Sequence, residues 1–265
     1  MSDYLELSYL QVFFAALLVL INGGISLSLK LGLERSLLIA SVRTIVQLLL
    51  IGMILGWVFE QQQWPIVLAV ITFMTVVAGV TAVSRLRRSY DNVYFNTLLS
   101  MWASSWLVGA YALFLVFRGI QPWYQPQYVI PVLGMILGNT LNGISIGLDT
   151  ILESFATKHR MIEMRLSLGA DRWEACRPEL RNAVRSGMIP IINSMMIVGL
   201  VSLPGMMTGQ LLSGTAPTEA VKYQIVIMFL IASATAIGTV LSTLIACHQL
   251  LNSQHCLEAH RITKR

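Results

Sequence analysis

Polar side chains interrupt several long apolar runs of this chain, and their chemistry needs an explanation. Arg43 stands in the run 37–59 with Gln47 one helical turn later, and Asn139 stands in the run 128–148. An unpaired charge in hydrocarbon costs at least about 2.5 kcal/mol, so such groups face a partner, water or a helix end. For Arg43 and Gln47 two interpretations stay open: a transport pathway, or a structural arginine whose long side chain reaches the polar boundary. For Asn139 the alternatives are a pathway and a hydrogen bond between helices.

A second candidate site is a break in the apolar run 188–212. Pro204 and Gly205 stand inside this run, and a proline removes a backbone hydrogen bond, which frees the backbone from Ser202 onward. Interrupted helices of this kind line substrate routes in transporters. A kink that serves only packing is the alternative.

Two methionines, Met206 and Met207, follow the break directly. Thioethers suit soft cations such as Cu(I) and are poor ligands for hard cations. Adjacent residues point about 100° apart on a helix, so the two side chains cannot both face one ion unless the backbone is unwound. Plain apolar packing is therefore the other interpretation of this pair.

The elements that must position these residues are helices that cross a membrane. The composition has 55% hydrophobic and only 12% charged residues, whereas soluble proteins carry roughly 25% charged residues. Apolar runs long enough to span a bilayer as helices cover residues 7–29, 37–59, 65–83, 96–117, 128–148, 188–212 and 225–247. We therefore expect an all-α integral membrane protein, a polytopic bundle of about seven transmembrane helices that forms one domain over residues 1–265.

Glycines repeat at a spacing of four in the fifth run. Gly134 and Gly138 form one pair, and Gly143 and Gly147 form another. Residues four apart lie on one face of a helix, and small residues there let a second helix approach closely. Helix packing is the function that this pattern indicates.

Lysine and arginine are concentrated in alternate loops of this arrangement. Fifteen basic residues lie in one set of loops and termini, and only Arg118 and Lys222 lie in the other. Because basic loops stay in the cytoplasm, the distribution predicts an N-terminus outside and a cytoplasmic C-terminus. It also explains the net charge of +5 without a nucleic-acid partner.

The longest loop, 149–187, is cytoplasmic in this topology and lies between the fifth and sixth runs. It is expected to be helical, with four apolar residues on one stripe: Ile151, Phe155, Ile162 and Leu166. Such a stripe needs a covering surface. The alternatives are a partner protein, the bilayer surface and the chain's own bundle.

No signature of catalysis accompanies these features. The sequence has no GxxxxGK[ST] phosphate loop, no HExxH, no GxSxG and no paired-cysteine metal motif. We therefore expect no enzyme, no catalytic residue and no cofactor, and the residues that would hold a metal are unknown. If transport uses ATP, another chain must hydrolyse it.

Several strings resemble one family of membrane proteins, the FetB family of ABC transporter permeases. The strings are Ser-Leu-Pro-Gly-Met-Met-Thr-Gly at 202–209, Ala-Val-Lys-Tyr-Gln-Ile at 220–225, Ile-Pro-Val-Leu-Gly-Met-Ile-Leu-Gly-Asn at 130–139, Leu-Ser-Leu-Gly-Ala at 166–170 and Val-Arg-Thr-Ile-Val-Gln at 42–47. The resemblance implies a permease of the inner (plasma) membrane that exports iron or another metal species. It also implies a separate cytoplasmic ABC ATPase as partner and a permease homodimer, and it is shared by plant aluminium-tolerance permeases.

The resemblance also implies roles for single residues. Glu163, followed after five residues by Gly169, resembles the loop that importer permeases insert into their ATPases, although the Ile-x-Leu-Pro ending of that loop is absent here. Coupling to the ATPase is therefore expected at Glu163, Leu168 and Gly169. The translocation pathway is expected at Arg43, Gln47, Asn139, Ser202, Pro204, Gly205, Met206 and Met207.

Two other functions remain open on the sequence. A secondary transporter or channel would need no ATPase, but proton coupling would require an acidic residue at depth, and Glu60, Asp149 and Glu219 all lie at the ends of runs. A membrane scaffold would use the loop 149–187 only to recruit a soluble partner.

Overall fold

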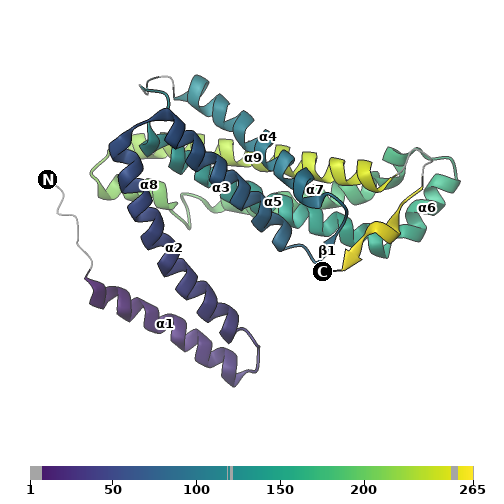
Figure 1. The fold of residues 1–265 in the computed structure, drawn as a ribbon, viewed down its shortest axis with the longest axis horizontal. Helices are drawn as coiled ribbons and strands as arrows, with labels where there is room; N and C mark the ends of the chain where they lie inside the picture. Colours follow the sequence, from purple (N-terminus) through teal and green to yellow (C-terminus); the bar gives the residue numbers. More distant parts are fainter. Residues whose placement is uncertain (1–7, 118, 120–121, 252–255, 265) are drawn as a thin grey trace. The chain divides into compact units, whose positions relative to one another are not determined.

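The structure is a computed structural model that describes residues 8–117, 119, 122–251 and 256–264 (Figure 1). The chain divides into two compact units, Met1–Gln62 with Leu212–Gly214, and Gln63–Leu211 with Thr215–Arg265.

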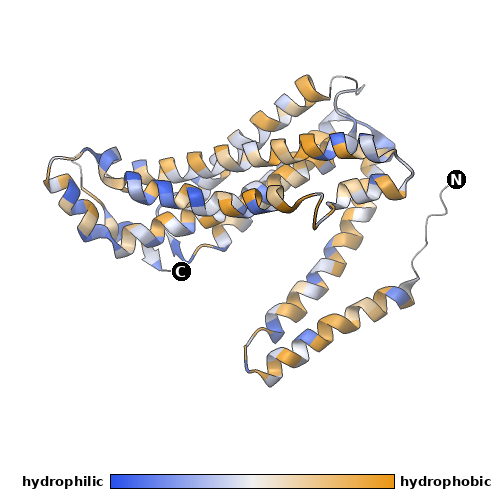
Figure 2. Cartoon of the chain, turned by 180° about the vertical axis from the view of Figure 1, so that it is seen from behind, coloured by the Kyte–Doolittle hydropathy of each residue, from blue (hydrophilic) through white to orange (hydrophobic). Residues whose placement is uncertain are grey.

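The first unit is a helical hairpin of α1 (Tyr9–Ser28) and α2 (Glu34–Gln61). Ser26 fixes the turn, because its hydroxyl donates to Glu34 Oε2 at 3.0 Å and accepts from the Leu33 amide at 3.0 Å. Gly32 adopts φ +69° in the same turn, a conformation that favours glycine. Most apolar side chains of both helices are exposed, and Figure 2 colours much of the hairpin as hydrophobic. Such a surface suits lipid as its solvent.

The second unit holds the remaining helices and a short sheet. Its long helices are α3 (Trp64–Ser84), α4 (Val93–Tyr111, continued by a π-helical turn Ala112–Val116), α5 (Pro126–Thr157), α7 (Arg172–Ile197) and α9 (Pro217–Leu250). Its short elements are α6 (His159–Ser167), α8 (Gly205–Leu212), the 3-10 turn Ala259–Arg261, and the strands β1 (Arg88–Ser89) and β2 (Thr263–Lys264). The strands pair antiparallel, with Arg88 opposite Lys264.

Close approach of α5, α7 and α9 confirms one of the two predicted glycine pairs. A Cβ built on Gly187 would lie 2.5 Å from the carbonyl oxygen of Gly143, and one built on Gly147 would lie 2.7 Å from Thr239 Cγ2. By contrast, a Cβ on Gly138 would meet nothing within 4 Å. Gly143 and Gly147 therefore serve helix packing; of the other pair, a Cβ on Gly134 would lie 3.2 Å from Met74 Cε of α3.

Six helices of the described residues are long and apolar enough to cross a membrane: α1, α2, α3, α4 with its π turn, α5 and α9. The seventh expected span, the interrupted run 188–212, is not a single helix in the structure. The helix α7 begins in a polar stretch at Arg172 and ends at Ile197, so its apolar part covers only about 15 Å at 1.5 Å per residue. The chain then loops until α8 starts at Gly205. The interruption therefore covers the whole loop 198–204 and begins before Pro204, next to Gly199 with φ +82°.

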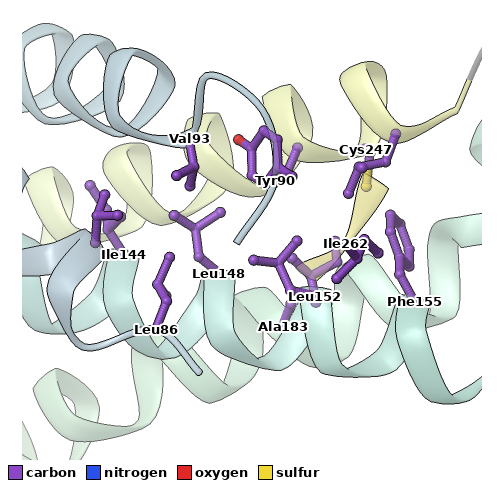
Figure 3. Close-up of a cluster of buried hydrophobic side chains, with 14 of the residues drawn as sticks. Leu86, Tyr90, Val93, Ile144, Leu148, Leu152, Phe155, Ala183, Cys247 and Ile262 are labelled. Carbon is purple, nitrogen blue, oxygen red and sulfur yellow. The ribbon is translucent and has the colours of Figure 1, made fainter. Parts of the chain in front are cut away.

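The helices α5, α7 and α9 continue beyond their apolar runs and form a buried cluster at one end of the unit (Figure 3). Leu152 and Phe155 of α5, Cys247 of α9 and Ile262 near the C-terminus lie in this cluster. The C-terminal residues therefore belong to the packed structure, and β2 fixes them to β1.

Candidate functional site

The loop 149–187, here called the α6 lobe, is helical as predicted. It contains the end of α5, the helix α6 and the first half of α7. Three residues of the predicted apolar stripe, Ile151, Phe155 and Ile162, have no exposed surface and lie in the buried cluster. The sequence left three alternatives for the surface that covers this stripe, and in the structure the chain's own bundle covers it.

An ion pair and a cap fix α6 to α7. Arg165 Nη1 lies 2.9 Å from Glu179 Oε2 and also donates to the Ala175 carbonyl at 2.7 Å. Asp171 caps α7, because its Oδ1 accepts from the amides of Trp173 and Glu174, each at 2.7 Å. An N-cap of this kind stabilises a helix by about 1 kcal/mol. The turn between α6 and α7 is therefore held from both sides.

The residues predicted to couple to an ATPase lie on the outside of this turn. Leu168 is 80% exposed, and Gly169 adopts φ +96°, which places the turn in a conformation that a residue with a Cβ disfavours. Glu163 is exposed, and its carboxylate forms no ion pair with any residue of the described chain. The structure thus places all three at the exposed tip of the α6 lobe.

Two further residues of this surface were missed by the sequence analysis. Met161 and Met164 are 45% and 57% exposed, and their spacing of three and four places them on one face with Leu168. We call these three residues the docking face. The helical spacing of residues 161, 164 and 168 is the sequence signal that could have identified this face. The docking face lies away from the buried side of α6, which carries Ile162.

Ion pairs join the α6 lobe to the membrane-spanning helices. Arg87, after α3, lies 2.7 Å from Asp149 on α5, and Arg88 lies 2.7 Å from Glu153. The hydrogen bond to Asp149 raises the pKa of Arg87 above its ordinary value. Because α5 is continuous from Pro126 to Thr157, a displacement of the lobe is transmitted directly to a spanning helix.

The C-terminal residues fasten the same end of the unit. Arg261 pairs with Asp91 at 2.9 Å and with Glu258 at 2.7 Å, and its hydrogen bonds to these carboxylates raise its pKa. Burial raises the pKa of Tyr90, one residue before Asp91, to about 12. The phenol of Tyr90 therefore stays neutral and accepts a hydrogen bond from Asn96 at 3.2 Å.

The predicted break is a compact loop next to a cavity. In this loop the Gly199 amide donates to the Ser202 carbonyl at 2.9 Å, and Gly199 has φ +82°. A cavity of about 320 Å³ lies beside it, and its lining includes Met195 of α7, Met207 of α8, and Gln224 and Met228 of α9. Three thioethers from three helices therefore face one space.

The predicted pathway residues of this unit differ in their position relative to the cavity. Met207 lines the cavity, whereas Met206 is not among the lining residues, as the expected angle between the two methionines requires. Ser202, Pro204 and Gly205 belong to the loop or to the start of α8 and do not line the cavity.

Asn139, of the same unit, does not line this cavity. Its side chain donates to the Met135 carbonyl of its own helix at 2.9 Å. Arg43 and Gln47 belong to the other unit, are exposed, and make no side-chain hydrogen bond or ion pair with any residue in the described ranges. Their role in a pathway stays a prediction.

Buried polar groups line the contact of α4, α5 and α9, which the sequence analysis did not identify. Thr97, Thr140, Thr235 and Thr239 are at most 1% exposed, and their hydroxyl oxygens have no hydrogen-bond partner among the residues that the structure describes. The signal was present in the spacing of Ser and Thr in 97–104 and 235–243. These small side chains let the helices approach closely, as a Cβ on Gly238 would lie 2.7 Å from Thr140 Cγ2.

Metal-ligating side chains are sparse. No group of three or more His, Cys, Asp or Glu residues that would hold a metal ion occurs within residues 8–117, 119, 122–251 and 256–264. Hard cations prefer carboxylate oxygens. The thioethers of the methionine-lined cavity suit soft cations better than hard ones.

Comparisons with known proteins agree with these features. A UPF0014 membrane protein of Synechocystis is 40% identical over 225 residues, which cover 85% of this chain and 86% of that protein. The probable iron export permease protein FetB of Escherichia coli is 28% identical over 251 residues, 95% of each chain. The protein ALUMINUM SENSITIVE 3 of Arabidopsis thaliana is 29% identical over 246 residues, 93% of this chain and 88% of that protein. No solved structure matches the chain.

The resemblance to the FetB family is thereby confirmed over nearly the whole length. The family described as uncharacterised protein family UPF0014 matches residues 9–251, a range that includes all six helices able to cross a membrane. The chain belongs to the UPF0014 family and is a multi-span membrane protein.

Proposed function

We propose that this chain is the permease subunit of an ABC transporter that exports iron or another metal species through the inner (plasma) membrane, and that a separate cytoplasmic ATPase drives it. The observation that carries the proposal is the docking face. An exposed apolar surface of Met161, Met164 and Leu168 stands on a lobe whose turn is held by the ion pair of Arg165 and Glu179. Exposed apolar patches on such a surface mark protein contacts.

The distribution of charge supports the cytoplasmic side for this lobe. Seven basic residues lie within 149–187, and basic loops stay inside the cell. The lobe is then on the side where ATP is available. Two permeases with two ATPases form the assembly that the FetB resemblance implies.

The mechanism follows from the connections of the lobe. Closure of the ATPases would press on the docking face and move α6. Arg165 and Glu179 pass this movement to α7, whose far end is the loop before Pro204. The continuous helix α5 passes it to the bundle. The helices around the loop would then open alternately to the two sides of the membrane.

The cavity beside this loop is the best candidate for part of the cargo route. Its lining is mostly apolar, with three thioethers and the side chain of Gln224, whose buried Oε1 has no hydrogen-bond partner in the described part of the chain. Such a lining accommodates a ferrous or complexed metal better than a bare ferric ion. The name of the Escherichia coli relative supports iron as the metal to test first.

The test uses the permease purified in lipid together with a P-loop ATPase from an adjacent reading frame, whose presence is the first requirement of the proposal. We expect the permease to change the rate of ATP hydrolysis, and Leu168→Glu to abolish that change, because a charge in the centre of the docking face opposes apolar contact. Asn182→Glu, which adds the same charge at an exposed site of α7, is the matched control and should behave like the wild type.

Three results would overturn the proposal. Transport at full rate without any ATPase would favour a secondary transporter or channel. A stable complex with the ATPase that never moves a cargo would favour a scaffold. An ATPase that responds equally to the wild type and to Leu168→Glu would remove the docking face from the mechanism.

A further inference from the structure

Three arginines form an unpaired row on α7. Arg177, Arg181 and Arg185 follow one another at a spacing of four, so they lie along one face of the helix. All three are exposed, and none forms an ion pair or side-chain hydrogen bond with any residue that the structure describes. Arg87, Arg88, Arg165 and Arg261, in contrast, all pair with carboxylates. The row therefore presents a concentrated positive charge that the chain itself does not neutralise.

The row borders a groove between α7 and α9. The groove has a volume of about 1090 Å³, and the three guanidinium-bearing residues form one part of its lining. The other part is aliphatic and consists of Pro178, Leu180 and Val184 of α7 and Val240 of α9. A ligand of this groove would thus be anionic on one side and apolar on the other.

The packing of α7 on α5 fixes the position of the groove along the membrane normal. Ala183 and Gly187, on either side of Arg185, approach Gly147 and Gly143 of α5. These glycines lie in the last turns of the apolar run of α5, which ends at Leu148 before the ion-paired Asp149. Arg185 therefore lies at the edge of the hydrocarbon layer, and Arg177 lies about 12 Å further out along the helix. The row crosses the depth at which lipid headgroups lie.

We propose that this groove binds an anionic phospholipid of the leaflet on the side of the α6 lobe. Its phosphate contacts the arginine row, because one guanidinium group can donate two parallel hydrogen bonds to phosphate oxygens. Basic grooves between spanning helices also bind lipid headgroups. Its acyl chain lies along Val184 and Val240. Two other anionic ligands fit the groove less well. A soluble phosphate ester would leave the aliphatic wall uncovered, and an acidic protein segment would have to enter the edge of the hydrocarbon layer.

The consequence is a lipid that joins α7 to α9. Because α7 also carries Glu179, the partner of Arg165, the lipid would stabilise the helix on which α6 is fixed. The inference rests on the chain spanning a membrane, and it does not depend on the ATPase or on the cargo. Lipid binding measured on the permease alone therefore tests it independently of the proposed transport.

The experiment measures lipid binding by the full chain in detergent, using native mass spectrometry with phosphatidylglycerol or phosphatidylcholine. We expect selective retention of phosphatidylglycerol. The double variant Arg181→Gln with Arg185→Gln should weaken this binding roughly 25-fold, because the loss of each arginine lowers the affinity about fivefold. Lys158→Gln with Arg160→Gln removes the same charge from exposed sites outside the groove and should change it little.

A second measurement decides the question even if the double variant does not fold. The thermal midpoint of the wild type should rise with phosphatidylglycerol and not with phosphatidylcholine, and added salt should reduce the rise. Equal effects of both lipids, or unchanged binding by Arg181→Gln with Arg185→Gln, would overturn the proposal. Competition by glycerol phosphate at concentrations equal to the lipid would assign the site to a soluble ester and would also overturn it.

Discussion

The guanidinium of Arg165 on α6 lies 2.9 Å from the carboxylate of Glu179 on α7, and Glu179 is only 3% exposed. This contact crosses the turn that carries Leu168 and Gly169. A buried carboxylate is tolerated there because a cation neutralises it, and the geometry of the turn depends on that cation. The pair therefore links the exposed tip of the α6 lobe to the helix that ends at the break.

The first prediction concerns the loss of this cation. Arg165→Met should lower the stability of the purified protein by about 3 kcal/mol, the low end for breaking a buried pair, because the Arg165 side chain is partly exposed. Thermal unfolding in detergent measures the loss. Arg165→Met combined with Glu179→Leu should recover most of the stability, since no charge is then left buried. A double variant as unstable as Arg165→Met would show that packing, and not the unpaired charge, causes the loss.

The second prediction concerns the backbone of the turn. Gly169 has φ +96° but open space around it, so Gly169→Ala acts through backbone strain alone, at a cost of about 1–2 kcal/mol. We expect a shifted turn, normal membrane insertion and reduced stimulation of the ATPase. Gly209→Ala is the control, because Gly209 is helical and also has open space. Equal stimulation by both variants would contradict a role for the shape of the turn.

Part of this structure was predictable from the sequence, because membrane spans and basic loops follow simple physical rules. Helices over the runs at 37–59, 65–83 and 128–148 appear as α2, α3 and α5, since lipid permits few other backbone conformations. The amphipathic stripe of the α6 lobe also predicted a helical segment with one buried side.

The rest depends on tertiary contacts that periodicity does not encode. The surface that covers Ile162 belongs to segments distant in the chain, so the sequence left three coverings open. The end of α7 at Ile197 depends on how Gly199 and Pro204 are accommodated together. For the same reason, the grouping of Met195, Met207 and Met228 from three helices around one cavity was not foreseen.

The third prediction tests the close packing of α5 and α7. Gly187→Ala places a Cβ 2.5 Å from the Gly143 carbonyl oxygen, which is backbone and cannot rotate away. Overpacking of this kind costs about 1–3 kcal/mol, and we expect a lower thermal midpoint in detergent. Gly138→Ala, on a helix face with open space, should leave the midpoint unchanged or raise it slightly, because alanine favours the helix. If both variants lowered the midpoint equally, the packing described here would be incorrect.

The fourth prediction concerns Pro204, which separates the loop after α7 from α8. Pro204→Ala restores a backbone N–H and allows α8 to begin earlier, so the loop beside the cavity should shorten. The exposed side chains of Leu200 and Val201 make few contacts, so the amount of protein in the membrane should change little. We therefore expect cargo transport to fall severalfold at constant expression, measured in vesicles with equal amounts of permease. Pro190→Ala, a change of a proline inside α7, is the control for the loss of a proline as such. Equal loss of transport and expression in Pro204→Ala would instead make this proline a structural residue, and the cavity would then lose its link to the cargo route.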